Sequence, residues 1–183
     1  MTKARAALSL TCLALVSGAC GDLPPPSEIE RGRALWAQTK ANCGTYHYTL
    51  VEADGNGRIT RTSFELTNDV PTARAYVRAR VEVANTPTMV VFVIEETWAE
   101  TTAELGTHPY SKPPRTMEQL YDDCERDVVP LDPATNGVTI SIDVRGALKS
   151  CTYGKSDCFD RCGRGDVVEG FACGPLDLTP ARP

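Results

Sequence analysis

The eight cysteines of this 183-residue chain constrain its fold more than any other feature. Disulfides persist in oxidising compartments, so the first question is whether the chain is exported. One cysteine, Cys12, lies in the N-terminal apolar stretch. The other seven lie at or after position 20: Cys20, Cys43, Cys124, Cys151, Cys158, Cys162 and Cys173.

The first 19 residues are typical of a secretory signal peptide. Lys3 and Arg5 supply a positive N-terminal region, and the apolar stretch 6–16 is too short to span a bilayer as a permanent helix. The small residues 17–19 then lead directly to Cys20. We therefore exclude residues 1–19 from the fold.

The segment that ends at Cys20 resembles a bacterial lipobox, in which this cysteine is acylated and becomes the mature N-terminus. Ser17 departs from the leucine that the motif prefers, and ordinary cleavage after Ala19 is the alternative. Acylation of Cys20 leaves six cysteines, an even number that can pair completely, and this favours the lipoprotein.

Acyl chains on Cys20, palmitate among them, would anchor the protein to a membrane, because two or more chains bind a bilayer stably. Sorting in enteric bacteria resembles a check for Asp after the cysteine, which retains a lipoprotein at the inner membrane. Gly21 stands there instead. We expect the outer membrane, at its periplasmic face or the cell surface.

The mature chain is expected to form one α+β domain. Residues 20–26 are a proline-rich tether, 27–150 the domain, and 151–183 a Cys-rich C-terminal extension packed on it. Capping boxes at Ser27 and Thr116 predict two helices. Alternating residues predict an antiparallel sheet of about six strands, over 45–52, 58–66, 73–83, 89–94, 138–144 and 148–153.

Details of the hydropathy pattern give further expectations. The first helix should bury Ile29, Gly32, Leu35 and Trp36. A shift of apolar parity between Ile59 and Phe64 predicts a bulge. Residues 89–94 are apolar on both faces, which predicts a strand in the centre of the sheet.

The six remaining cysteines could form disulfides, a metal site or a redox centre. Their spacings lack the paired Cys-x-x-Cys pattern that zinc sites and redox motifs use, and both histidines lie far away in sequence. Three disulfides are therefore favoured, without metal or cofactor. Of fifteen connectivities, we expect Cys43 with Cys124, and the four C-terminal cysteines paired among themselves.

One strand offers a candidate contact surface. Its alternate residues Ala73 to Val83 should face the core, leaving Arg74, Tyr76, Arg78 and Arg80 exposed. These residues could bind an anionic headgroup, a polysaccharide carboxylate or a partner. The favoured alternative is a solvated face on which Glu65, Glu82, Glu95 or Glu96 neutralises the arginines.

Two short motifs suggest binding but have simpler explanations. Residues 52–63 resemble a calcium loop at Asp54, Asn56 and Gly57, yet Ser63 replaces the essential bidentate glutamate, so a hairpin turn is favoured. The Arg-Gly-Asp tripeptide at 164–166 matches the sequence that animal integrins bind, but a β-turn is the default for three such residues.

The sequence shows no set of catalytic residues. A serine hydrolase could use only His47 or His108, and the Gly-x-Ser-x-Gly elbow is missing. The net charge of -5 argues against nucleic acid as a partner. We expect a non-enzymatic binding or structural module of the envelope, with a protein or polysaccharide partner. The alternative is a secreted hydrolase, or a hydrolase inhibitor that uses its Cys-rich C-terminal loop.

Several segments also occur in the order seen in an uncharacterised family of bacterial secreted proteins and lipoproteins, a domain of unknown function. They are Trp36, 46–49, the helix start at 116–121, and 140–143. The chain resembles this family over about residues 30–150. The resemblance implies a small α+β domain and assigns no catalytic residue.

Overall fold

The computed structural model describes residues 27–54, 56–83, 90–108, 112–132, 134–155 and 164–178. Cys20, Cys158 and Cys162 lie outside these ranges, as do the signal peptide and the tether. The described residues form two helices and seven strands: α1 (Glu28–Ala41), β1 (Thr45–Ala53), β2 (Arg58–Thr67), β3 (Val70–Val83), β4 (Val90–Thr101), α2 (Met117–Asp127), β5 (Asn136–Ile142), β6 (Leu148–Lys155) and β7 (Arg164–Cys173).

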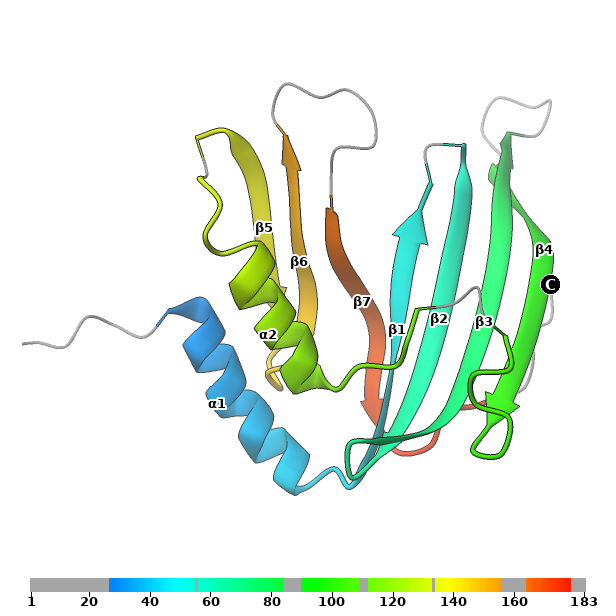
Figure 1. Cartoon of the computed structure of the whole chain (residues 1–183), viewed down its shortest axis with the longest axis horizontal. Helices are drawn as coiled ribbons and strands as arrows, with labels where there is room; N and C mark the ends of the chain where they lie inside the picture. The colour runs from blue at the N-terminus through cyan, green and yellow to red at the C-terminus, as the bar shows by residue number, and fades with distance from the viewer. Residues whose placement is uncertain are drawn as a thin grey trace, which may run out of the picture.

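The strands form one antiparallel sheet in the order β4-β3-β2-β1-β7-β6-β5. Each helix is followed by an antiparallel meander, and β7 joins the two meanders by pairing with β1. Both helices lie on the same face, over the half of the sheet that contains β5, β6 and β7 (Figure 1). Within the described residues, no helix has the length and apolar character to cross a bilayer. The predicted α+β class is confirmed.

Both helices begin where their capping boxes predict. The Ser27 hydroxyl accepts the N–H of Glu30 while the Glu30 carboxylate accepts the N–H of Ser27. Thr116 and Gln119 make the same reciprocal pair at α2. These bonds satisfy amide groups that a helix start leaves without partners.

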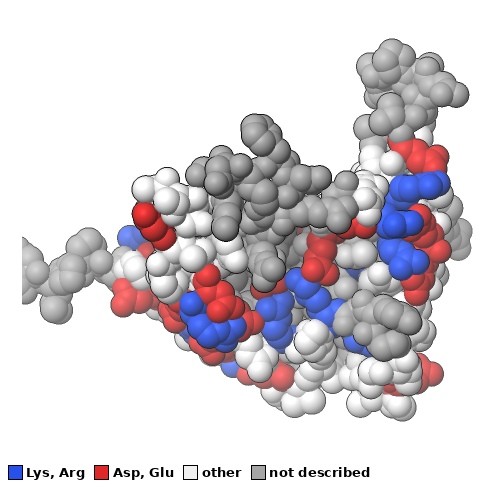
Figure 2. Space-filling view, turned by 45° about the horizontal axis from the view of Figure 1, so that its top comes forward, with Lys and Arg blue, Asp and Glu red and all other residues white. Residues whose placement is uncertain are grey.

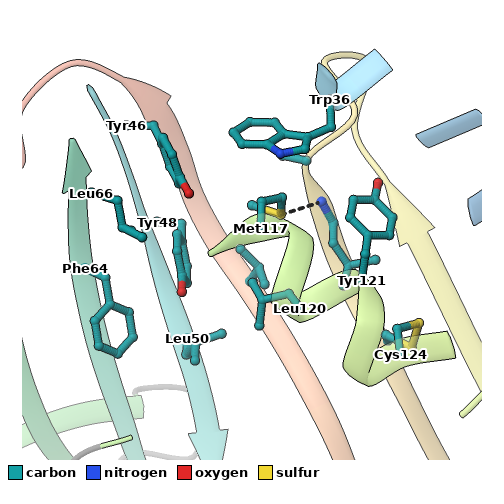
Figure 3. Packing of buried hydrophobic residues seen from close by; sticks show 14 of the residues in the cluster. Trp36, Tyr46, Tyr48, Leu50, Phe64, Leu66, Met117, Leu120, Tyr121 and Cys124 are labelled. Atoms are coloured by element: carbon teal, nitrogen blue, oxygen red, sulfur yellow. Dashed lines mark hydrogen bonds between the residues drawn. A yellow bond between two sulfur atoms is a disulfide. The ribbon is translucent and has the colours of Figure 1, made fainter. Parts of the chain in front are cut away.

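The hydrophobic core lies between the helices and the inner face of the sheet (Figure 3). Tyr46, Tyr48 and Leu50 alternate along β1 toward the helices, as predicted. The core residues drawn from both helices and the central strands are Trp36, Tyr46, Tyr48, Leu50, Phe64, Leu66, Met117, Leu120, Tyr121 and Cys124. Leu35, expected in the core, is 41% exposed because it lies on the outer flank of α1.

The C-terminal segment differs most from expectation. The expected boundary at 150/151 falls inside β6, and β7 occupies a central position between β1 and β6. The Cys-rich segment therefore completes the sheet and adds a strand to the six predicted. Its glycine and cysteine content predicted an irregular loop. The strand was missed because apolar and polar residues alternate little along it.

The expected disulfide pairing is wrong. Cys43 bonds Cys173, and Cys124 bonds Cys151. Cys124 points inward from α2, as predicted, but the sulfur it meets lies on β6 beneath the helix. Cys43 follows α1 and lies beside the end of β7, because Tyr46 and Cys173 are register partners. Each bond thus joins a helical segment to a C-terminal strand.

The two remaining details of the sheet also differ from expectation. No bulge separates Ile59 from Phe64, because Thr62 takes the inward position and Ile59 faces the opposite side of the sheet. The register shift in β2 lies at Glu65/Leu66 instead. The strand predicted over 89–94 was expected in the centre of the sheet, but β4, which contains most of it and extends to Thr101, is an edge strand.

Gly146 lets the β5–β6 turn pack tightly against α1. Its φ is +79°, and a Cβ would lie 2.5 Å from the Gly32 carbonyl and closer still to the Trp36 amide. Gly146→Ala should therefore lower the free energy of unfolding by at least about 2 kcal/mol, through both strain and overlap.

Gly106 is the matched control for this substitution. Its φ is +95°, but a Cβ there would meet nothing within 4 Å. Gly106→Ala should cost only the conformational part, about 1–2 kcal/mol. If urea unfolding showed that both variants lose the same free energy of unfolding, the packing argument would be contradicted.

Candidate functional site

The candidate contact surface divides into a buried part and an exposed part. Arg74, Tyr76, Arg78 and Arg80 share one face of β3, as predicted, but this is the face on which the helices lie. Arg74 and Tyr76 are each 4% exposed, so the expectation that the set is solvent-facing is wrong for them. The alanines at 73 and 79, expected inward, face the opposite side.

The exposed arginines are neutralised by glutamates. Arg78 lies 3.1 Å from Glu96 and 3.4 Å from Glu95, and Arg80 pairs with Glu82. Side chains of opposite charge therefore lie side by side on the surface (Figure 2). This is the arrangement expected of a solvated, charge-balanced face, although Glu65 does not contribute to it. Glu65 lies on the other face, where it accepts the N–H of Leu176 and the hydroxyl of Thr72.

Arg74 forms a buried ion pair with Glu100. The two residues are register partners on β3 and β4, and their side chains are 5% and 1% exposed. The guanidinium donates from Nε at 3.0 Å and from Nη2 at 2.6 Å to Glu100 Oε2. Its Nη2 also donates to the His108 carbonyl at 3.0 Å.

Glu100 organises the loop that follows β4. Its carboxylate accepts the backbone N–H groups of Gly106 and His108 at 3.0 and 2.7 Å and the Thr107 hydroxyl at 2.9 Å. Burial opposes ionisation of this carboxyl group, but the hydrogen bonds from Gly106, His108 and Thr107 outweigh it and lower its pKa to about 2. Glu100 is therefore an anion at neutral pH, with both oxygens occupied.

The ring of His108 completes the cluster. Its Nδ1 lies 2.7 Å from Glu100 Oε1, and because an ionised carboxylate only accepts, Nδ1 donates. The ring stacks on Trp98 at 4.4 Å between centroids, and Trp98 stacks in turn on Tyr76 at 5.0 Å. The side chain of His108 is 45% exposed, so this histidine is held by a carboxylate while part of the ring reaches solvent.

Sequence reasoning considered His108 but missed Glu100 and Trp98. Trp98 and Glu100 share one side of β4, and Thr97, Trp98 and Thr101 are residue types that favour strands, which was the available signal for an extended β4. His47, the other candidate histidine, lies on the opposite face, where its Nδ1 is 3.1 Å from the Gly174 carbonyl.

A second charged cluster surrounds Asp166 of the Arg-Gly-Asp tripeptide. Arg115 binds its carboxylate through two hydrogen bonds of 2.7 and 2.8 Å, and Lys112 lies at 3.1 Å. Burial raises the pKa of Asp166, but the hydrogen bonds and positive charge of Arg115 and Lys112 lower it by more. The pKa of this carboxyl group therefore lies below its ordinary value. The side chain is 13% exposed in a strand, so the expected β-turn is wrong and the carboxylate is not presented for recognition.

The same cluster lines a cavity of about 700 Å³ between α2 and β6–β7. Its lining includes Arg115 and Asp166, the α2 residues Asp123, Arg126 and Asp127, and the Cys124–Cys151 disulfide. Asp123 pairs with both arginines, at 2.8 and 2.7 Å. Each carboxylate of this cavity is thus paired with an arginine.

Metal coordination has no support in the part of the chain that the structure describes: there, no three His, Cys, Asp or Glu residues are grouped to hold an ion. Asp54, Gly57 and Arg58 lie in a hairpin turn, as favoured over a calcium loop. Asp54 Oδ1 accepts the N–H groups of Asn56 and Arg58 at 2.9 Å, and β1 and β2 pair up to Ala53 and Ile59.

Comparisons of the chain with protein-family models, with curated proteins and with solved structures found no match.

Proposed function

We propose that this protein is an extracytoplasmic lipoprotein, anchored through acylated Cys20, that serves as a non-catalytic binding or structural module of the cell envelope. The observation that carries the proposal is the combination of an export signal ending at Cys20 with two disulfides that each join a helical segment to a C-terminal strand. Disulfides of this kind persist in oxidising compartments. The absence of Asp at position 21 favours the outer membrane.

The surroundings of His108 support a non-catalytic role. Both oxygens of Glu100 accept hydrogen bonds from the loop 106–108, so the carboxylate stabilises backbone structure. The Thr107 hydroxyl lies on the Nδ1 side of His108, 3.3 Å away, and donates to Glu100. This order differs from that of a hydrolase, in which the nucleophile and the carboxylate lie on opposite ring nitrogens. The partner is an envelope protein or a polysaccharide.

Acylation of Cys20 predicts a specific result in metabolic labelling. A labelled fatty acid should be incorporated into the wild-type protein and not into Cys20→Ser, because the thioether sulfur is lost. Cys12→Ser is the matched control, since this cysteine lies within the signal peptide and should leave the labelling unchanged. Label retained by Cys20→Ser would disprove the anchor.

A second candidate, a hydrolase, is favoured by one observation: Nδ1 of His108 faces an ionised carboxylate, while the side chain is 45% exposed. A histidine held in this way can act as a general base toward water. If this is the function, turnover of chromogenic esters should fall at least tenfold in His108→Gln. No turnover, or equal turnover in both proteins, would exclude His108 as the base in ester hydrolysis.

A further inference from the structure

The cavity between α2 and β6–β7 is lined by polar groups whose orientation is already fixed. Arg115 bonds both oxygens of Asp166 and donates to Asp123 Oδ2 at 2.8 Å. Arg126 donates to the other oxygen of Asp123 at 2.7 Å and bonds both oxygens of Asp127 at 2.8 and 2.7 Å. Each of these side chains is held by at least two hydrogen bonds. Little of their conformational entropy is therefore left to lose when a ligand binds.

The same groups retain capacity for further hydrogen bonds. Arg126 uses Nε and Nη2, and its Nη1 donates to no described residue, so both N–H groups of Nη1 are available. Each oxygen of Asp123 and Asp127 accepts one of the bonds above, and a carboxylate oxygen has two lone pairs. The side chains of Arg126 and Asp127 are 64% and 55% exposed. A ligand in the cavity thus meets donors and acceptors side by side.

The pairing of these charges determines which class of ligand they suit. Every carboxylate of the described lining is paired with an arginine, so an anion would lie beside aspartates and a cation would compete with the arginines. An apolar ligand would remove water from the charged groups without replacing its hydrogen bonds, which is costly. A hydroxyl group both donates and accepts. An uncharged ligand with several neighbouring hydroxyls therefore fits best, and sugars are this class.

An aromatic side chain lies in the same lining. Tyr153 follows Cys151 by two residues, so it lies on the same face of β6, the face that carries α2, and it is half-buried. A tyrosine ring combines an apolar surface with a polar hydroxyl. The pyranose ring of a sugar likewise has an apolar face of C–H groups and a rim of hydroxyls. Stacking on Tyr153 would cover that face while the rim reaches the charged groups.

The cavity continues into a second hollow, which indicates a ligand longer than one sugar. This hollow has a volume of about 490 Å³ and lies beside β1, and it shares Tyr153 and Gly165 with the first. Its charged residues, Glu52 and Lys112, form an ion pair of 3.0 Å, so it too is charge-balanced. A linear chain of sugars can occupy both hollows across Tyr153.

We propose that this cavity binds an uncharged segment of an envelope polysaccharide, with one sugar ring stacked on Tyr153 and hydroxyls bonded to Arg126 and Asp127. The inference rests on the proposed function, because it chooses the polysaccharide among the partners of a non-catalytic module. The volume of about 700 Å³ lies within the usual range of ligand sites, about 300–1,000 Å³. A peptide is the less suitable ligand, because peptide recognition uses pockets for apolar side chains. The apolar part of the described lining consists of Val128 and the disulfide.

Equilibrium binding of short oligosaccharides to the full-length protein tests the proposal, in a detergent without a sugar headgroup. Chitotetraose, an oligomer of N-acetylglucosamine, and maltotetraose, an oligomer of glucose, distinguish an amino-sugar polymer from a plain hexose polymer as the source. At least one should bind, and Arg126→Ala and Tyr153→Leu should each weaken its binding by about tenfold or more. Thermal unfolding followed by circular dichroism checks that each variant is folded.

Arg33→Ala is the matched control for Arg126→Ala. Arg33 also pairs with two carboxylates, Asp122 and Glu125, but it lies outside the cavity, so binding should be unchanged. No binding of either oligosaccharide to the folded wild-type protein would overturn the proposal. Binding that Arg126→Ala and Tyr153→Leu leave as strong as in Arg33→Ala would do the same.

Chemical modification of arginines locates the site without any substitution. Phenylglyoxal reacts with accessible guanidinium groups, so the bound oligosaccharide should slow the modification of Arg126 and leave that of Arg31, which is exposed on α1, unchanged. Modification of Arg126 at the same rate with and without sugar would contradict the location. Fatty-acid labelling of Cys20 is independent of both measurements. A missing sugar site would therefore leave the proposed anchor standing, and a missing anchor would leave the sugar site standing.

Discussion

Replacing Cys43 and Cys173 together with alanine should lower the free energy of unfolding by about 5 kcal/mol. This bond closes a loop with a sequence separation of 130, and the chain-entropy relation gives about that value for a loop of this size. Removing Cys124 and Cys151 should cost less, about 3.5 kcal/mol, because that loop spans 27 residues.

Urea unfolding of the two double variants under non-reducing conditions measures the difference. Cys124 and Cys151 are both buried, at 2% and 3% exposure, whereas Cys173 is exposed. If packing outweighed loop closure, the variant lacking Cys124 and Cys151 would be the less stable of the two. That order would contradict the argument from loop length.

Glu100→Ala should lower the free energy of unfolding by about 3–5 kcal/mol. The substitution leaves the Arg74 guanidinium buried without its counter-ion and removes the acceptor for the loop amides of Gly106 and His108. A double variant, Arg74→Met with Glu100→Leu, should recover much of this loss, since it removes both charges and fills similar space. A double variant less stable than Glu100→Ala would show that the loop, and not the ion pair, dominates.

The acid sensitivity of the protein should depend on the same carboxylate. The folded state holds the pKa of Glu100 at about 2, below its ordinary value of 4.5. Its contribution to stability is therefore complete above about pH 4.5 and is lost as the pH falls toward 2. Between those values the stability of wild-type protein should fall more steeply than that of Glu100→Gln. Parallel curves would disprove the assignment.

Local signals predicted local structure well in this chain. Both helices begin at their capping boxes because side-chain and backbone partners there are only three residues apart. The apolar alternation of β1 likewise identifies the face that contacts the helices. Such features depend only on residues that are close in sequence, so the sequence alone is enough to predict them.

Long-range features were less predictable. The neighbours of β4 and β7 depend on strand order, which hydropathy does not encode, and an apolar strand was therefore assigned to the centre of the sheet. The disulfide pairs depend on the same order, because Cys173 reaches Cys43 only when β7 lies beside β1. The alternation of charged and apolar residues along β3 also gave a wrong prediction of which face is buried. Arg74 is buried because Glu100 faces it across the strand pair.

The Cys43–Cys173 bond has a mechanical consequence for a protein tethered at one end. A pull between the proposed anchor at Cys20 and the C-terminus would be transmitted through α1 to Cys43 and across the sulfur atoms directly to Cys173. The 130 residues of sequence separation between them carry no tension, and about 450 Å of contour length stays locked. Under load, the described domain can yield only at α1 and at the few residues after β7. All seven described strands lie within the covalent loop that this bond closes, so force on the proposed anchor does not unfold the sheet until the bond is reduced.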